Sequence, residues 1–110
     1  MAMKQDLNQY GLSERDMAEI FRILQSQPEI ARVHIFGSRA KGTYHSGSDI
    51  DLAIMNEGAG FAVIQRLSEQ FSESSLPFVV DLVDYTQLSH AEFKEHIDRV
   101  GKLFFERALK

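Results

Sequence analysis

The sequence predicts a two-layer α+β domain in which helices cover a short mixed β-sheet. Three observations lead to this prediction: apolar residues at helical spacing, strand-like runs between them, and the order helix, strand, loop, strand, helix, strand, helix. A chain of 110 residues has the size of one domain, so residues 1–110 are expected to form a single unit. The helices are expected to pack on one face of the sheet and to leave the other face or its edge for chemistry.

The first helix is predicted to begin at Ser13 and to end before Pro28. Ser13 and Asp16 have the spacing of a capping box, with Asp in place of the usual Glu or Gln. Apolar side chains then follow on one helical face, at Met17, Ile20, Phe21 and Leu24. The residue before a proline is pushed out of the helical region, so Pro28 marks the end.

Strands are predicted over residues 30–36, 49–55 and 78–84. The first and third are rich in β-branched and aromatic residues, which favour strands. In the second, isoleucine and leucine alternate with aspartate and alanine, which places the two sets on opposite faces. Residues 39–48 contain glycine and hydroxyl residues and indicate a loop, with one helical turn allowed after Ser38.

Two further helices are predicted in the second half of the chain. One spans residues 61–71, with Phe61 on its apolar side. The last begins at a capping box formed by Ser89 and Glu92. Phe105 lies off the apolar stripe of that helix and is expected at the surface or in a contact with another chain. The stripe itself consists of Phe93, Ile97, Val100 and Phe104.

The composition excludes several classes of function. A net charge of −4 is opposite to the balance with which proteins hold nucleic-acid phosphates, so general nucleic-acid binding is not expected. The absence of cysteine excludes a disulfide scaffold, a thiolate zinc site and a cysteine nucleophile. No apolar run reaches the roughly 18 residues of a membrane span, and the first residues lack the apolar core of a signal peptide. We expect a cytoplasmic protein without membrane attachment.

Three aspartates are candidate metal ligands. Asp49 and Asp51 are two residues apart on a predicted strand, so both carboxylates lie on one face. Two such charges roughly 5 Å apart repel by about 3 kcal/mol at an effective dielectric of 20, and hard oxygen ligands suit Mg²⁺ or Mn²⁺. Asp81 interrupts an apolar strand and joins the pair if the two strands are neighbours. The alternatives are a solvated strand start for the pair and an edge charge that discourages aggregation for Asp81.

Gly37 and Ser38 directly follow the first predicted strand and form a candidate phosphate-binding turn. Glycine lets the backbone approach a ligand closely, and a serine at a helix start offers N–H groups and a hydroxyl to an anion. Arg39 and Lys41 add positive charge where a phosphate would lie. Alone, a Gly-Ser pair is more commonly a plain turn.

Together these motifs resemble those of a known superfamily. Gly37-Ser38, then ten residues, then Asp-Ile-Asp-Leu, with an aspartate on a later strand, resembles the nucleotidyltransferases that share the DNA polymerase β palm. The stretches Phe-Gly-Ser-Arg-Ala-Lys-Gly and Gly-Ser-Asp-Ile-Asp-Leu-Ala-Ile are most similar to the minimal nucleotidyltransferases, the MNT family. The resemblance covers residues 33–85, half of the chain, and implies a palm-like nucleotidyltransferase fold.

The resemblance also implies the roles of individual residues. Catalytic and metal-binding roles go to Asp49, Asp51 and Asp81, which would hold two Mg²⁺ ions, with Mn²⁺ as a possible substitute. The third of these carboxylates would also help to deprotonate the acceptor hydroxyl. Nucleotide contacts go to Gly37, Ser38, Arg39, Lys41 and Ser48.

The activity implied by the resemblance is transfer of AMP from ATP, or of another nucleoside monophosphate, to a hydroxyl acceptor. Larger family members have an extra acceptor-binding domain, for which 110 residues leave no space, so a second polypeptide is expected to provide the acceptor. The family implies a small all-helical HEPN-type partner, encoded nearby, in a toxin–antitoxin pair. Two alternatives stay open: a non-catalytic antitoxin that neutralises its partner by contact, and an antibiotic or other small-molecule adenylyltransferase. The presence of all three aspartates favours catalysis.

Overall fold

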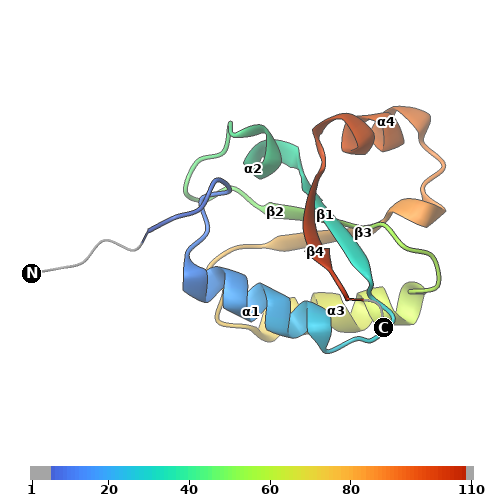
Figure 1. The fold of residues 1–110 in the computed structure, drawn as a ribbon, viewed down its shortest axis with the longest axis horizontal. Coiled ribbons are helices and arrows are strands. Elements are labelled where there is room, and N and C mark those ends of the chain that lie inside the picture. The colour runs from blue at the N-terminus through green and yellow to red at the C-terminus, as the bar shows by residue number, and fades with distance from the viewer. Residues whose placement is uncertain (1–5, 109–110) are drawn as a thin grey trace, which may run out of the picture.

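The computed structural model describes residues 6–108 of the chain. Within this range helices and strands alternate in the order drawn in Figure 1. They are α1 (Glu14–Gln25), β1 (Arg32–Phe36), α2 (Gly37–Lys41), β2 (Ile50–Ile54), α3 (Phe61–Glu73), β3 (Val80–Asp84), the 3-10 helix η1 (Tyr85–Gln87), α4 (Ala91–Val100) and β4 (Lys102–Glu106).

The strands form a mixed sheet in the order β3-β2-β1-β4. β1 is antiparallel to both β2 and β4, whereas β2 and β3 are parallel. The predicted class, a short mixed sheet with helices, is therefore confirmed. Asp51 of β2 lies between Phe36 of β1 and Asp81 of β3 in the register of the sheet. This register brings the end of β1 and the beginnings of β2 and β3 together.

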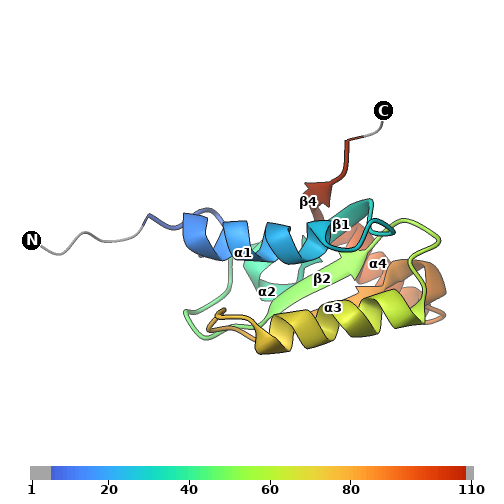
Figure 2. The same ribbon diagram turned by 90° about the horizontal axis from the view of Figure 1, so that it is seen from below.

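Helices cover both faces of the sheet, which corrects the expectation of cover on one face. α1 and α3 lie side by side on one face, and α4 lies on the opposite face (Figure 1 and Figure 2). The larger core lies under α1 and α3 and includes the fully buried side chains Ile50, Leu52 and Ile54 of β2. A smaller core on the other face joins Phe36, Ala53 and Ile97. The second face needs this cover because it also carries apolar side chains.

The start of α1 agrees with the prediction. The Ser13 hydroxyl accepts a hydrogen bond from the Asp16 N–H at 3.1 Å, and the Asp16 carboxylate accepts one from the Ser13 N–H at 3.0 Å. These two bonds satisfy amides that the first turn of a helix leaves without partners. The helix ends at Gln25, shortly before Pro28.

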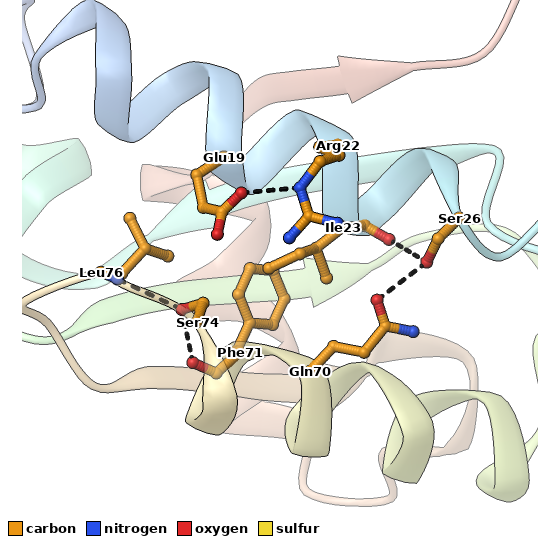
Figure 3. Close-up of polar contacts among 8 residues, drawn as sticks. All are labelled: Glu19, Arg22, Ile23, Ser26, Gln70, Phe71, Ser74 and Leu76. Carbon is orange, nitrogen blue, oxygen red and sulfur yellow. Dashed lines mark hydrogen bonds and ion pairs between the residues drawn. The ribbon is translucent and has the colours of Figure 1, made fainter.

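Contacts between α1 and α3 fix the layer under the sheet. The Ser26 hydroxyl, just after α1, donates to the carboxamide oxygen of Gln70 on α3 at 3.1 Å (Figure 3). At the end of α3 the Ser74 hydroxyl donates to the Phe71 carbonyl oxygen and accepts from the Leu76 N–H. This turn ends α3 and directs the chain back toward β3.

The end of the chain differs from the prediction of one long helix. α4 starts after His90, whose ring nitrogen Nδ1 accepts from the Phe93 N–H at 3.1 Å, so Ser89 is not the capping residue. The helix ends at Val100, and the residues after Gly101 form β4 instead of another helical turn. The helical spacing of apolar residues continues past Gly101, but pairing with the open edge of β1 prevails over this local pattern.

A bulge in β4 explains why two consecutive phenylalanines are both buried. Val33 pairs with Phe105 and His34 pairs with Leu103, so Phe104 is an extra residue between two paired ones. The Phe104 ring packs edge-on against Phe21, with ring centroids 5.5 Å apart. Phe105 belongs to the same core, which corrects its expected position at the surface.

Among residues 6–108, no helix has the length and apolar character needed to cross a lipid bilayer.

Candidate active site

The junction between β1 and α2 brings the backbone of Gly37 against the carboxylate of Asp51. Gly37 has a φ of +74°, a conformation that residues with a side chain rarely adopt. A Cβ atom at Gly37 would lie 3.0 Å from the carboxyl carbon of Asp51 and closer still to one of its oxygens. The glycine predicted as a phosphate-binding residue is therefore required here by its own backbone and by its neighbour.

The predicted aspartates gather at the same end of the sheet. Asp51 and Asp81 are register partners on parallel strands, so their side chains project from the same face. Asp49 precedes Asp51 by two residues, immediately before β2 begins. Asp51 is half-buried, whereas Asp49 and Asp81 are exposed. The sequence prediction that Asp81 lies on a strand beside the pair is confirmed.

Electrostatics set Asp51 apart from the other two aspartates. Burial of its carboxyl group, followed by the charges of Asp81 and Asp49, raises the pKa of Asp51 to about 6. Burial and like charges both disfavour the ionised form. A cation beside these groups would reverse the balance and favour three ionised carboxylates.

The chemistry of these donors fits a divalent cation. Carboxylate oxygens are the ligands that Mg²⁺ and Mn²⁺ prefer, and the charges of Asp81 and Asp49 add to burial in raising the pKa of Asp51. Within residues 6–108, however, no three Asp, Glu, His or Cys side chains converge closely enough to form a complete metal cage. An ion held by these aspartates would therefore need further ligands from water or substrate phosphate.

Arg39 is placed differently from the expected phosphate contact. Its side chain is inside the protein with 1% of its surface exposed. Its guanidinium donates to backbone carbonyl oxygens, among them that of Tyr10 at 2.7 Å and that of Ser48 at 2.8 Å. Burial lowers the pKa of Arg39 from its ordinary value. The Arg39 guanidinium therefore stabilises the interior of the protein. The positive charge that remains at the surface of α2 is that of Lys41.

The other predicted nucleotide-binding residues surround the Gly37 turn. Ser38 is the second residue of α2 and is partly buried, and Lys41 is exposed at the end of that helix. The Ser48 hydroxyl accepts from the His45 N–H at 2.9 Å, which closes a turn just before Asp49. Ser38 thus comes from the start of α2 and Ser48 from the loop before Asp49, while Lys41 lies three residues after Ser38.

Two aromatic residues near this site were missed by the sequence reasoning. The Arg39 guanidinium lies 4.6 Å from the ring centroid of Phe78 and 5.3 Å from that of Tyr44. Phe78 is 39 positions from Arg39 in the chain, so no local spacing signals the contact. The only available signal was the Pro-Phe start of the third predicted strand.

A separate hollow of about 490 Å³ lies at the opposite end of β3 from Asp81. Its lining includes Asp84 at the end of β3 and Phe61 at the start of α3. Phe61 is 81% exposed, so the prediction that it lies on the buried side of its helix is wrong. The buried residues of this helix are Val63, Leu67 and Phe71.

Most of this chain matches a known protein family. The family described as Polymerase beta, Nucleotidyltransferase matches residues 18–109. The chain belongs to this nucleotidyltransferase family. The match includes the Gly37 turn and all three aspartates, and the predicted family and fold are confirmed.

Individual relatives of this nucleotidyltransferase agree. It is 41% identical over 100 residues to a Haemophilus influenzae protein named Probable protein adenylyltransferase MntA, a match that covers 90% of this chain and 87% of the relative. A crystal structure of a toxin–antitoxin with AMP-PNP is similar with a TM-score of 0.68 at 26% identity, covering 84% of this chain and 74% of that one. A tri-AMPylated Shewanella oneidensis HEPN toxin in complex with MNT antitoxin gives a TM-score of 0.61 at 22% identity, covering 83% and 70%, and supports the fold.

Proposed function

We propose that this protein is a protein adenylyltransferase that transfers AMP from ATP to a hydroxyl group on a small, all-helical HEPN-type partner. The observation that carries the proposal is the contact between Gly37 and Asp51, with Asp81 beside Asp51 in the sheet. This contact supports the assignment of the Gly37 turn to phosphate and of the neighbouring carboxylates to metal. The relative named as a protein adenylyltransferase and the toxin–antitoxin structure with AMP-PNP support the choice of donor and of a protein acceptor.

In this proposal Asp49, Asp51 and Asp81 would hold two Mg²⁺ ions, and Mn²⁺ could replace them. When bound, such ions neutralise the triphosphate and stabilise the attacking and leaving oxygens of an in-line displacement. Without a cation, the three neighbouring carboxylates repel one another. Binding of cations relieves this repulsion, so the repulsion favours metal binding.

The residues of this chain divide the remaining work. The Gly37 turn and the Ser38 hydroxyl bind phosphate oxygens, and Lys41 and Ser48 contribute further contacts with the nucleotide. A carboxylate oxygen of Asp81 accepts the proton of the acceptor hydroxyl. The acceptor oxygen then bonds to the α-phosphorus, the bond to the bridging oxygen breaks, and pyrophosphate leaves. Each of these assignments rests on the position of the residue around the end of the sheet.

The acceptor must approach from the side that the helices leave free. α4 covers the part of the second face at Ala53, whereas Asp81 lies exposed on the edge strand β3. A hydroxyl on a partner protein can therefore reach Asp81 without displacing any element of the fold. We propose that the reaction takes place in the cytoplasm, where ATP is available. We also propose that the chain forms a single nucleotidyltransferase domain.

The test is intact-mass analysis of the protein and the neighbouring-gene product after incubation with ATP and Mg²⁺. We expect the partner to gain mass in AMP units with the wild type and to gain none with Asp49→Asn or Asp51→Asn. Asp84→Asn is the matched control, because Asp84 lies at the other end of β3 and an Asn oxygen can still accept from the Thr86 N–H.

Three results would contradict parts of the proposal. A stable complex without any mass gain would favour an antitoxin that acts by contact alone. AMP transfer to an aminoglycoside and not to the partner would favour a small-molecule adenylyltransferase. Equal transfer by Asp49→Asn and the wild type would show that the metal ligands are assigned incorrectly.

A further inference from the structure

Arg39 is a buried cation that forms no direct ion pair with a carboxylate among the described residues, although the charges of Asp16 and Asp49 act on it from a distance. Its donors are used by backbone carbonyl oxygens instead. Nη1 donates to Tyr10 at 2.7 Å, and Nη2 and Nε donate to Ser48 at 2.8 and 3.2 Å, with longer contacts to Gly11 and Ser46 at 3.5 Å. A charge is expensive to bury unless it is fully hydrogen-bonded. The arrangement is therefore specific to the planar, five-donor guanidinium group.

Aromatic rings complete the surroundings of this cation. The rings of Phe78 and Tyr44 lie 4.6 Å and 5.3 Å from the guanidinium carbon, within the range of a cation–π attraction. Tyr44 belongs to the loop between α2 and β2, and Phe78 to the segment that leads into β3. The two contacts connect α2 to both of these segments.

Three segments that meet at Arg39 lead directly to predicted site residues, whereas a fourth, at Tyr10 and Gly11, leads to α1. Arg39 itself follows Ser38, Ser48 precedes Asp49, and Phe78 lies three residues before Asp81. A backbone hydrogen bond from the Ile50 N–H to the Val79 carbonyl oxygen, at 2.9 Å, joins the last two segments beside the guanidinium. The Arg39 side chain thus contacts the segments that lead to the site residues, but it is not itself part of the site.

We propose that Arg39 is a positioning residue that fixes Asp49 relative to the Gly37 turn and to Asp81. The proposal rests on the proposed function, since it assigns a role in the same site. Arg39 does not contact substrate. It acts through the Ser48 carbonyl, which holds the end of the loop, and through Phe78, which holds the start of β3.

Lysine is the informative replacement. Arg39→Lys keeps the positive charge, but an ammonium group is a point donor on a flexible stem and cannot donate to both the Tyr10 and Ser48 carbonyls with the geometry of a guanidinium. We expect the loop before Asp49 to lose its fixed position. A displacement of about 1 Å in a catalytic group lowers rates by as much as 100-fold, so kcat should fall by roughly 10- to 100-fold with a smaller change in KM for ATP.

Arg107→Lys is the matched control. Arg107 donates to the carbonyl oxygens of Ile30 at 3.0 Å and Gln27 at 3.1 Å and lies 5.7 Å from the Phe105 ring centroid. Like Arg39, it donates to backbone carbonyls beside an aromatic ring, but at the opposite end of β1 from Gly37. We expect a loss of thermal stability similar to that of Arg39→Lys, with kcat within about twofold of the wild type.

The experiment measures AMP transfer to the partner, the melting temperature, amide hydrogen exchange at Ser48 and Ile50, and Mn²⁺ binding by the free protein. Both amides are hydrogen-bonded in the wild type, to His45 and Val79. For Arg39→Lys we expect faster exchange at both amides and weaker Mn²⁺ binding. Tyr44→Leu, which removes one of the two stacking rings, should give a smaller change in the same direction and serves if Arg39→Lys does not fold.

Exchange at Ser48 and Ile50 that equals that of the wild type, or unchanged kcat and Mn²⁺ binding in a folded variant, would overturn the positioning role. The loss of stability alone would then describe Arg39 fully. If the wild type itself transfers no AMP, the proposed function fails. Hydrogen exchange and Mn²⁺ binding would still decide whether Arg39 positions Asp49.

Discussion

The backbone of Gly37 and the carboxylate of Asp51 occupy adjoining space, with only 3.0 Å between the carboxyl carbon and the place where a Cβ of residue 37 would be. The contact follows from the register of the sheet, in which Asp51 pairs with Phe36, the residue before Gly37. The proposed phosphate site at the turn and the proposed metal site at the carboxylate are therefore adjacent.

Gly37→Ala should abolish AMP transfer and destabilise the fold. The new methyl group would meet the Asp51 carboxylate, and the positive φ is unfavourable for alanine. We expect a loss of about 2 kcal/mol in the free energy of unfolding and at least a roughly 100-fold loss of rate. Urea unfolding and the mass assay measure the two effects.

Gly42→Ala is the control for that substitution. Gly42 also has a positive φ, +83°, but a Cβ there would have no neighbour within 4 Å. The expected cost is about 1 kcal/mol of stability with activity retained. Equal activity of the two alanine variants would mean that the contact with Asp51 has no catalytic importance.

Asp51→Asn should make the metal-free protein more stable at neutral pH while it removes activity. Its carboxyl has a pKa of about 6 in the folded protein and an ordinary value of 3.8 when unfolded. The ionised group therefore costs no stability below pH 3.8, an increasing amount up to pH 6, and a constant amount above that. Because the group is partly exposed, we expect a gain of only about 1 kcal/mol at pH 7.5.

Urea unfolding without divalent cations, at pH 4 and pH 7.5, measures this difference. Asp84→Asn is again the control variant. Asp84 caps η1 and lies at the other end of β3 from Asp81, the register partner of Asp51. A variant at Asp51 that is less stable than the wild type at pH 7.5 would show that the carboxylate stabilises the fold, against the sign argued from its surroundings.

His34 should make stability fall in mild acid. Burial is the main cause that lowers the pKa of His34, and the charge of Arg32 acts in the same direction. The folded state therefore binds a proton more weakly than the unfolded state, whose histidine has its ordinary pKa of 6.5. The stability from neutral His34 is present above pH 6.5 and is lost as the pH falls through the lower folded value.

Comparison of melting temperatures for the wild type and His34→Gln between pH 8 and pH 5.5 isolates this effect. The difference between the two proteins should change most below pH 6.5. A difference that is constant with pH would show that His34 is not protonated differently in the two states.

Phe105→Ala should cost about 3 kcal/mol of stability, because Phe105 is 6% exposed and packs in the main core through β4. Leu103→Ala, on the same strand but 50% exposed, should change stability by less than about 0.5 kcal/mol. Urea unfolding measures both. A neutral effect of Phe105→Ala would support the helical end that the sequence alone predicted.

The parts of the fold that the sequence predicted correctly depend on neighbours in the chain. The capping box of Ser13 and Asp16 and the alternation around Asp51 are both local patterns, and both appear in the structure. The position of Asp81 beside Asp51 was expected from the resemblance to nucleotidyltransferases, which implies a third carboxylate on a later strand.

The parts that could not be predicted depend on contacts between distant segments. Phe104 keeps the helical spacing of the residues before it, and only the open edge of β1 makes it part of a strand. Arg39 lies in a motif next to a phosphate-binding turn, so its charge suggested a ligand. Its burial depends on Tyr10 and Phe78, which come from opposite halves of the chain.

Among residues 6–108, β3 has a neighbouring strand on one side only, and two of its residues, Asp81 and Asp84, are acidic. Negative charge on an edge strand hinders other chains from extending the sheet by hydrogen bonding. The Asp81 carboxylate therefore has two roles: it takes part in the proposed reaction, and its charge protects the sheet edge from association. A descendant of this protein that gave up catalysis would still be under selection to keep an acidic or similarly repellent side chain at that position. Retention of Asp81 in a silent homologue would thus be a poor indicator of activity, and retention of Asp51 a better one.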